Sequence, residues 1–116
     1  MGKKTSITVT RIKCNKASEA GHDEIFVTFQ ADGGFRTRLP RLVGRQSMAT
    51  GDSWDINHTA EFHNDLQVML FESDSLHIVN IDYLGSFAFT PLDVPSEVAI
   101  IKPDDAQYTL YVTRNA

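Results

Sequence analysis

The chain has 116 residues, which suits one domain with one hydrophobic core, and 41% of the residues are hydrophobic. No apolar run approaches the roughly 18 residues of a transmembrane helix, and no signal-peptide core follows the charged N-terminus. A single cysteine excludes an internal disulfide framework, and a net charge of −4 argues against nucleic-acid binding. We therefore expect one domain over residues 1–116, cytoplasmic or peripheral to a membrane.

The charge is distributed unevenly along the sequence. Residues 1–45 carry nine basic and four acidic side chains, a net +5, whereas residues 46–116 carry two basic and eleven acidic ones, a net −9. This asymmetry favours a basic patch and an acidic patch on one small protein. The alternative is that folding mixes the two halves and disperses both patches.

Apolar and polar side chains alternate with a period of two, which predicts strands. The expected strands are about eight, over residues 6–14, 23–30, 35–39, 53–58, 66–71, 83–89, 97–101 and 108–113. The alternation slips near Arg11, which indicates a bulge, and Asp32-Gly33-Gly34 is a strong hairpin signal. Residues 41–51 show no regular pattern and are expected to form a loop. The pattern predicts an antiparallel sandwich without helices.

Several side chains are assigned from their residue type and place in this pattern. Cys14 ends a strand and is expected to be a buried or half-buried thiol, while Trp54 and the phenylalanines are expected in the core. An exposed edge at residues 108–113 would allow pairing between copies, so a homo-oligomer is one possible state.

The stretch over residues 66–85 organises the chain. A strand ends there, Glu72-Ser73-Asp74 follows it, and Asp82 comes just before the next apolar run. Three carboxylates in one loop repel each other unless water, lysines or a hard cation offsets the repulsion. Calcium suits such a loop because it takes oxygen ligands from flexible segments.

Several of these segments together resemble C2 domains, the calcium- and phospholipid-binding eight-stranded β-sandwiches. Residues 23–27 resemble the family's Asp-Pro-Tyr-Val strand, and Glu72-Ser73-Asp74 with residues 82–85 is similar to its Asp-x-Asp loop and following Asp-x-Ile-Gly. Trp54 with Phe62 and residues 66–68 are similar to its Trp-x-x-x-Phe and Leu-x-Val run, at a longer spacing. The resemblance implies an eight-stranded antiparallel C2-like β-sandwich.

The resemblance also implies a calcium site. Its ligands would be Asp23, Glu72, Asp74 and Asp82, with Glu19 as the nearest acid in the first loop. Ala17 stands where the family usually has an aspartate, and Glu72 replaces an aspartate, so the site departs from the family pattern. Solvated acidic loops, with Asp23 or Asp82 capping a turn, are the alternative.

Two further features suggest contact with a membrane or an acidic partner. Arg36 and Arg38 share one face of a strand, and Arg41 and Arg45 follow them, so this set could bind anionic lipid headgroups. Leu76, Ile78 and Val79 would form a membrane-dipping tip if they were exposed.

No pattern in the sequence points to an enzyme, because there is no nucleophile elbow and no phosphate loop. The four histidines lack the paired spacing of a zinc site. We predict a non-catalytic binding module that uses calcium to dock onto a membrane or a protein partner. The alternatives are a calcium-independent protein-interaction or self-assembly sandwich, and a carbohydrate-binding sandwich that stacks sugars on Tyr83, Tyr108 or Tyr111.

Overall fold

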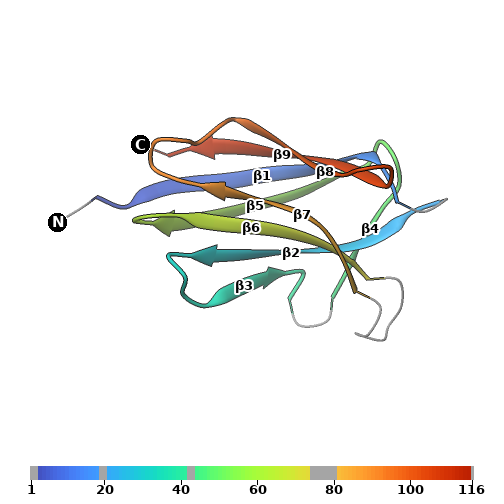
Figure 1. Cartoon of the computed structure of the whole chain (residues 1–116), viewed down its shortest axis with the longest axis horizontal. Helices are drawn as coiled ribbons and strands as arrows, with labels where there is room; N and C mark the ends of the chain where they lie inside the picture. The colour runs from blue at the N-terminus through green and yellow to red at the C-terminus, as the bar shows by residue number, and fades with distance from the viewer. Residues whose placement is uncertain (1–2, 19–20, 42–43, 74–80, 116) are drawn as a thin grey trace.

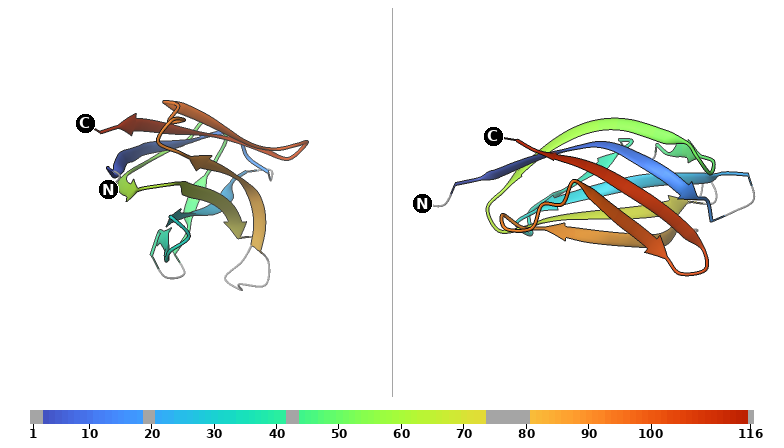
Figure 2. Two further views of the ribbon diagram at one scale, coloured as in Figure 1. Left: turned by 60° about the vertical axis from the view of Figure 1, so that its left-hand side comes forward. Right: turned by 90° about the horizontal axis from the view of Figure 1, so that it is seen from above.

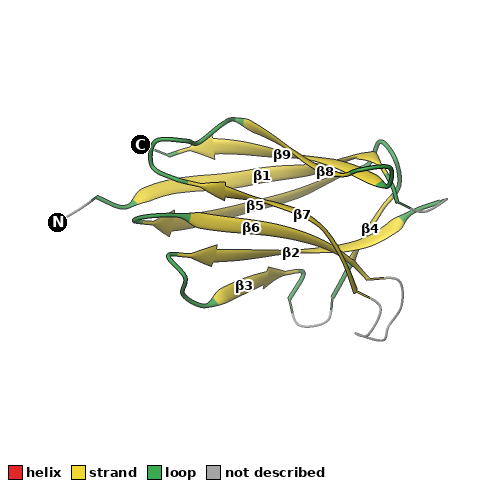
Figure 3. Ribbon diagram, viewed as in Figure 1, coloured by secondary structure: helices red, strands yellow, loops and turns green. Residues whose placement is uncertain are grey.

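Nine strands make up the secondary structure of the described residues (Figures 1 and 3). The structure is a computed structural model, and it describes residues 3–18, 21–41, 44–73 and 81–115. The strands are β1 (Thr5–Lys16), β2 (Asp23–Ala31), β3 (Arg36–Leu39), β4 (Gln46–Met48), β5 (Ser53–Phe62), β6 (Leu66–Ser73), β7 (Ile81–Phe89), β8 (Glu97–Lys102) and β9 (Ala106–Arg114). No helix capable of crossing a membrane occurs in these ranges.

The strands form two antiparallel sheets that pack face to face (Figure 2). One sheet has the order β5-β1-β9-β8. The other has the order β3-β2-β6-β7, with β4 also paired to β2. The predicted all-β antiparallel sandwich is therefore confirmed, with nine strands in place of eight.

The period-two pattern explains the core, because alternate side chains of each strand point between the sheets. Ile7, Val9 and Ile12 of β1 and Val68 and Leu70 of β6 are all at most 1% exposed. The register of β1 shifts between Val9 and Arg11, as the break in alternation predicted. Cys14 is also fully buried, in agreement with the prediction.

The predicted elements differ from the structure in three places. β4 was expected to be loop; its three residues are too few to show a period, and they are ordered by pairing with Asp23–Ile25 of β2. Strict alternation along β7 predicted that Leu84 and Phe89 point to opposite faces of the sheet. The pairing of β6 with β7 shifts register between Leu70 and Phe71, and both Leu84 and Phe89 are buried in the core. β9 is not an edge strand, because it pairs with both β1 and β8.

Three phenylalanines, Phe26, Phe35 and Phe71, lie outside the core between the sheets. Phe35, in the turn between β2 and β3, is completely exposed, so its assignment to the core was wrong. Phe26 is buried, but on the outer face of its sheet, where Phe71 stacks on it at 4.9 Å between ring centroids. The guanidinium of Arg38 covers Phe26 at 3.6 Å from the ring centroid.

The strand directions define two ends of the sandwich (Figure 1). β2 and β7 both run antiparallel to β6, so both begin at the same end. We call that end, which holds Asp23, Glu72 and Asp82, the acidic end. We call the opposite end, where both chain termini lie, the terminal end.

Candidate functional site

The sheet places three of the predicted calcium ligands at the acidic end. Asp23 is the first residue of β2, and Glu72 of β6 pairs in register with Asp82 of β7. Asp23 and Glu72 are buried, whereas Asp82 is exposed. Glu19 and Asp74 lie outside the described residues, as do Leu76, Ile78 and Val79.

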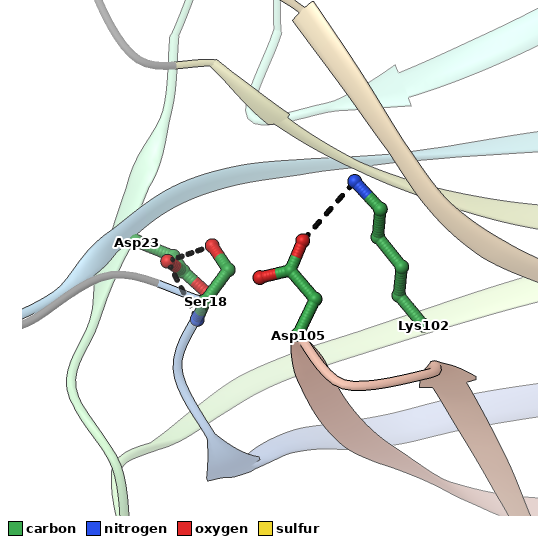
Figure 4. A network of polar contacts seen from close by, with 4 residues as sticks. All are labelled: Ser18, Asp23, Lys102 and Asp105. Carbon is green, nitrogen blue, oxygen red and sulfur yellow. Dashed lines mark hydrogen bonds and ion pairs between the residues drawn. The ribbon is translucent and has the colours of Figure 1, made fainter.

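The carboxylate of Asp23 is held by donors from the protein itself (Figure 4). The backbone N–H of Ser18 donates to Oδ1 and Oδ2 at 3.0 and 2.9 Å, and the Ser18 hydroxyl donates to Oδ1 at 2.6 Å. The hydroxyl of Tyr108 donates to Oδ2 at 2.7 Å. Both oxygens of Asp23 are therefore committed to protein hydrogen bonds.

The donor role of Tyr108 is fixed by its surroundings. Burial raises the pKa of Tyr108 far above its ordinary value of 10.0, and the hydrogen bond to Asp23 raises it further. The phenol therefore keeps its proton at any physiological pH, and that proton points at the carboxylate.

Lys102 supplies one positive charge at the acidic end (Figure 4). Lys102 Nζ lies 3.1 Å from Asp105 Oδ2, across the turn from β8 to β9. The hydrogen bond to Asp105 raises the pKa of Lys102, and the negative charges of Asp105, Asp82 and Glu72 raise it further. The acid in contact with Lys102 is thus Asp105, which lies outside the predicted ligand set.

The described part of the acidic end does not assemble an open calcium site. No group of three or more His, Cys, Asp or Glu side chains within it is arranged to hold a metal ion. Two features accompany this arrangement: the Asp23 carboxylate already accepts hydrogen bonds, and the Lys102 ammonium is paired with Asp105. Ser18 and Lys102 lie five and three residues from their partners but outside the motifs, and Tyr108 reaches Asp23 from the other sheet.

The arginines lie along β3 and the segment after it. Arg36 and Arg41 are exposed and, with Arg38, line a shallow depression of ≈ 460 Å³. The head group of Arg38 is held in place, donating to Pro40 O at 3.3 Å and to Gly44 O at 2.7 Å. Arg45 donates to Ser73 O at 3.4 Å. Arg36 and Arg41 are thus the two guanidiniums that project from this set.

The three tyrosines predicted as sugar-stacking candidates differ in exposure. Tyr108 is 1% exposed, and the guanidinium of Arg11 covers the ring of Tyr111 at 4.4 Å from its centroid. Tyr83 is 49% exposed, but its ring packs at a tilt against Phe71, and its hydroxyl bonds Ser86 at 2.7 Å. Tyr108 therefore cannot stack a sugar, whereas Tyr83 keeps an exposed ring.

No protein-family model matches the sequence, and no curated protein matches it either. Solved structures do match in shape. A C2 domain of plant extended synaptotagmin 1 aligns over 99% of this chain and 96% of its own, with 12% identity and a TM-score of 0.57. A structure of CC2D1B, described as coordinating ESRCT-III activity during mitotic reformation of the nuclear envelope, aligns over 97% of this chain with 11% identity and a TM-score of 0.58. Human GIVD cytosolic phospholipase A2 aligns over 97% of this chain with 9% identity and a TM-score of 0.54.

These similarities establish the class of fold. The chain is a C2-like β-sandwich, as the sequence motifs indicated. It spans 54% of the CC2D1B chain and 16% of the phospholipase chain, so the activities of those whole proteins are not transferred to it.

Proposed function

We propose that this chain is a non-catalytic binding module that docks onto an anionic membrane surface through Arg36 and Arg41, without a requirement for calcium. The observation that carries the proposal is the depression along β3, where two exposed guanidiniums lie beside Arg38. Guanidinium groups bind phosphate oxygens through several hydrogen bonds, and basic surface side chains near an anionic leaflet each favour binding by about 1 kcal/mol.

Calcium independence is inferred from the acidic end. Lys102 places an ammonium group beside Asp105 and within the field of Glu72 and Asp82. A divalent ion there would have to displace this group or suffer its repulsion. The lysine therefore supports a module that keeps the sandwich and does not need the metal.

Sedimentation with vesicles tests the proposal. Vesicles of phosphatidylcholine with phosphatidylserine should bind the protein equally in calcium and in chelator, and vesicles of phosphatidylcholine alone should bind it more weakly. The double variant Arg36→Gln/Arg41→Gln should lose most of the binding. The matched control Lys13→Gln/Lys16→Gln removes two charges from β1 of the other sheet and should bind like the original protein.

Calcium-assisted docking is the second candidate. It is favoured by the in-register pair of Glu72 and Asp82 at one end of the sandwich, where C2-like sequences carry acidic loops. In that case vesicle binding would appear only with calcium, and Asp74→Asn would abolish it. If vesicle binding depends on neither calcium nor the arginines, and the protein binds a protein partner or a second copy of itself, the result would instead support a protein-interaction module.

A further inference from the structure

We propose that the terminal end of the sandwich enters an anionic lipid bilayer through two apolar turn tips, Phe35 and Leu92. This inference rests on the proposed membrane function and adds the orientation and the inserting residues. It places the membrane at the end opposite to the acidic loops.

The two tips are almost completely exposed. Phe35 is 100% exposed and Leu92 is 99% exposed. The other exposed large hydrophobic side chains of the described residues retain 39% to 54% of their surface. Single exposed apolar residues are common on protein surfaces. Two almost fully exposed apolar side chains at the same end of a small domain are less common and indicate an interaction site.

The tips leave the same end of the fold from two strands that flank β6. Ala31 of β2 pairs with Leu66 of β6, and Leu66 pairs with Phe89 of β7, so these three residues form one row across the sheet. Neighbouring strands lie about 4.8 Å apart, which puts the ends of β2 and β7 about 10 Å from each other. The turns after these strands carry Phe35 and Leu92, and both turns lie at the terminal end (Figures 1 and 2).

Both turns are built to hold their shape. In the first turn, Gly34 N–H donates to Ala31 O at 2.9 Å. The carboxylate of Asp32 also accepts the backbone N–H groups of the neighbouring turn, residues 63–65, at 2.7 to 3.1 Å. In the second turn, Asp93 N–H donates to Thr90 O at 3.0 Å. The backbone therefore presents the two apolar side chains to the exterior.

The charges of the two ends favour the same orientation. Arg36 follows Phe35 directly, and Arg114 donates to Pro91 O at 2.7 Å beside Leu92. Lys3 and Lys4 lie at the same end, in a hollow that they share with Arg114 and Glu61. Acids are present as well (Asp32, Glu61, Asp65 and Asp93), so this end is balanced overall. At the other end the acids Asp23, Glu72, Asp82, Asp104 and Asp105 outnumber the basic Lys16, Arg45 and Lys102, so that end is the more acidic. An anionic bilayer repels the acidic end and leaves the terminal end as the one that can approach.

A bilayer fits the tips better than a protein pocket does. A stable protein interface needs about 800 Å² of contiguous surface on each partner, and two separate tips with polar residues between them do not supply it. The fluid interfacial region of a bilayer accepts isolated apolar side chains, with cations at the headgroup level. Arg36 also joins the tip to the arginine-lined depression, so one approach engages both.

The test compares variants on vesicles of phosphatidylcholine with phosphatidylserine. Phe35→Ala/Leu92→Ala should lower the partition coefficient by at least about tenfold, because burial of two large apolar side chains is lost. Its thermal unfolding midpoint should not change, since neither side chain packs on the protein. The control Ile81→Ala/Ile101→Ala removes apolar surface elsewhere and should partition like the original protein. A Phe35→Trp variant should show a blue-shifted emission and quenching by brominated lipids.

The outcomes separate this inference from the proposed function. Vesicle binding that depends on Arg36 and Arg41 but not on Phe35 and Leu92 would overturn the insertion and leave arginine-mediated docking intact. Binding that depends on the tips but not on the two arginines would support the insertion and overturn the arginine site. A protein that binds no vesicle, even if it captures a protein partner, would overturn both.

Discussion

Tyr108 and Asp23 are 85 residues apart in the chain, yet the Tyr108 hydroxyl donates a buried hydrogen bond of 2.7 Å to Asp23 Oδ2. The bond joins β9 of one sheet to β2 of the other at the acidic end. It satisfies a buried carboxylate and a buried phenol at once, which apolar packing could not do. The same aspartate that the motif marks as a metal ligand thus ties the two sheets together.

We expect Tyr108→Phe to lower the free energy of unfolding by about 1–3 kcal/mol, because it leaves a buried carboxylate with one donor fewer. Tyr83→Phe is the control, since it removes a hydroxyl whose partner, Ser86, is on the surface. That variant should change stability by less than about 0.5 kcal/mol. Urea unfolding of both variants measures the difference, and equal stability would mean that the buried bond contributes nothing.

The role of Lys102 is tested by thermal unfolding with calcium and with chelator at matched ionic strength. A ligand that binds only the folded protein stabilises it by about 2.7 kcal/mol at a hundredfold excess over its dissociation constant, which would raise the midpoint by several degrees. We expect no such rise for the original protein. We expect calcium to stabilise Lys102→Ala, because Asp105, Asp82 and Glu72 would lose their nearby ammonium.

Lys16→Ala is the matched control for that experiment, since Lys16 is an exposed lysine at the end of β1. It should respond to calcium like the original protein. A calcium-specific rise in the original protein would contradict the assignment of Lys102 and support calcium-assisted docking through Glu19, Asp23, Glu72, Asp74 and Asp82. A rise in both variants alike would point to a general loss of positive charge.

Asp32 should make the protein sensitive to acid. Hydrogen bonds from the backbone N–H groups of His63, Asn64 and Asp65 lower the pKa of Asp32 below its usual 3.8. A carboxyl whose folded pKa is depressed contributes stability above the unfolded pKa and loses that contribution as the pH falls through the folded value. We therefore expect Asp32→Asn to be less stable at neutral pH and to lose less stability below about pH 4.

Asp104→Asn is the matched control for Asp32. Asp104 also has a positive φ, 60° against 53° for Asp32, so backbone preference is the same in the two variants. The free energy of unfolding of Asp104→Asn should fall with decreasing pH in the same way as that of the original protein. Chemical unfolding at a series of pH values gives all three curves, and parallel curves for Asp32→Asn and the original protein would remove the role of the carboxylate.

The strands were predictable because alternation is a local property of the sequence, and β6, β8 and β9 follow it closely. β4 was not, because three residues carry no period and only pairing with β2 orders them. The C2-like motifs located the acidic end correctly. They could not show that Tyr108 donates to Asp23, because this contact, 85 residues apart in the chain, depends on how the two sheets pack. Ser18 and Lys102 lie only five and three residues from Asp23 and Asp105, but neither belongs to the motifs. Phe35 shows the converse: its residue type predicts burial, but the hairpin turn exposes it.

Gly85 of β7 should not tolerate a side chain. Its φ is +148°, and a Cβ built on it would lie 2.7 Å from Ile100 Cγ2, where β7 faces β8 of the other sheet. We expect Gly85→Ala to lower the free energy of unfolding by about 1–3 kcal/mol, through overpacking and a backbone conformation that alanine disfavours. Gly33→Ala, at φ +70° with no atom within 4 Å of the added Cβ, carries the backbone cost alone. Chemical unfolding of the two variants therefore separates backbone strain from steric overlap with Ile100. If Gly33→Ala loses as much free energy of unfolding as Gly85→Ala, the close approach of β8 to β7 does not add to the cost.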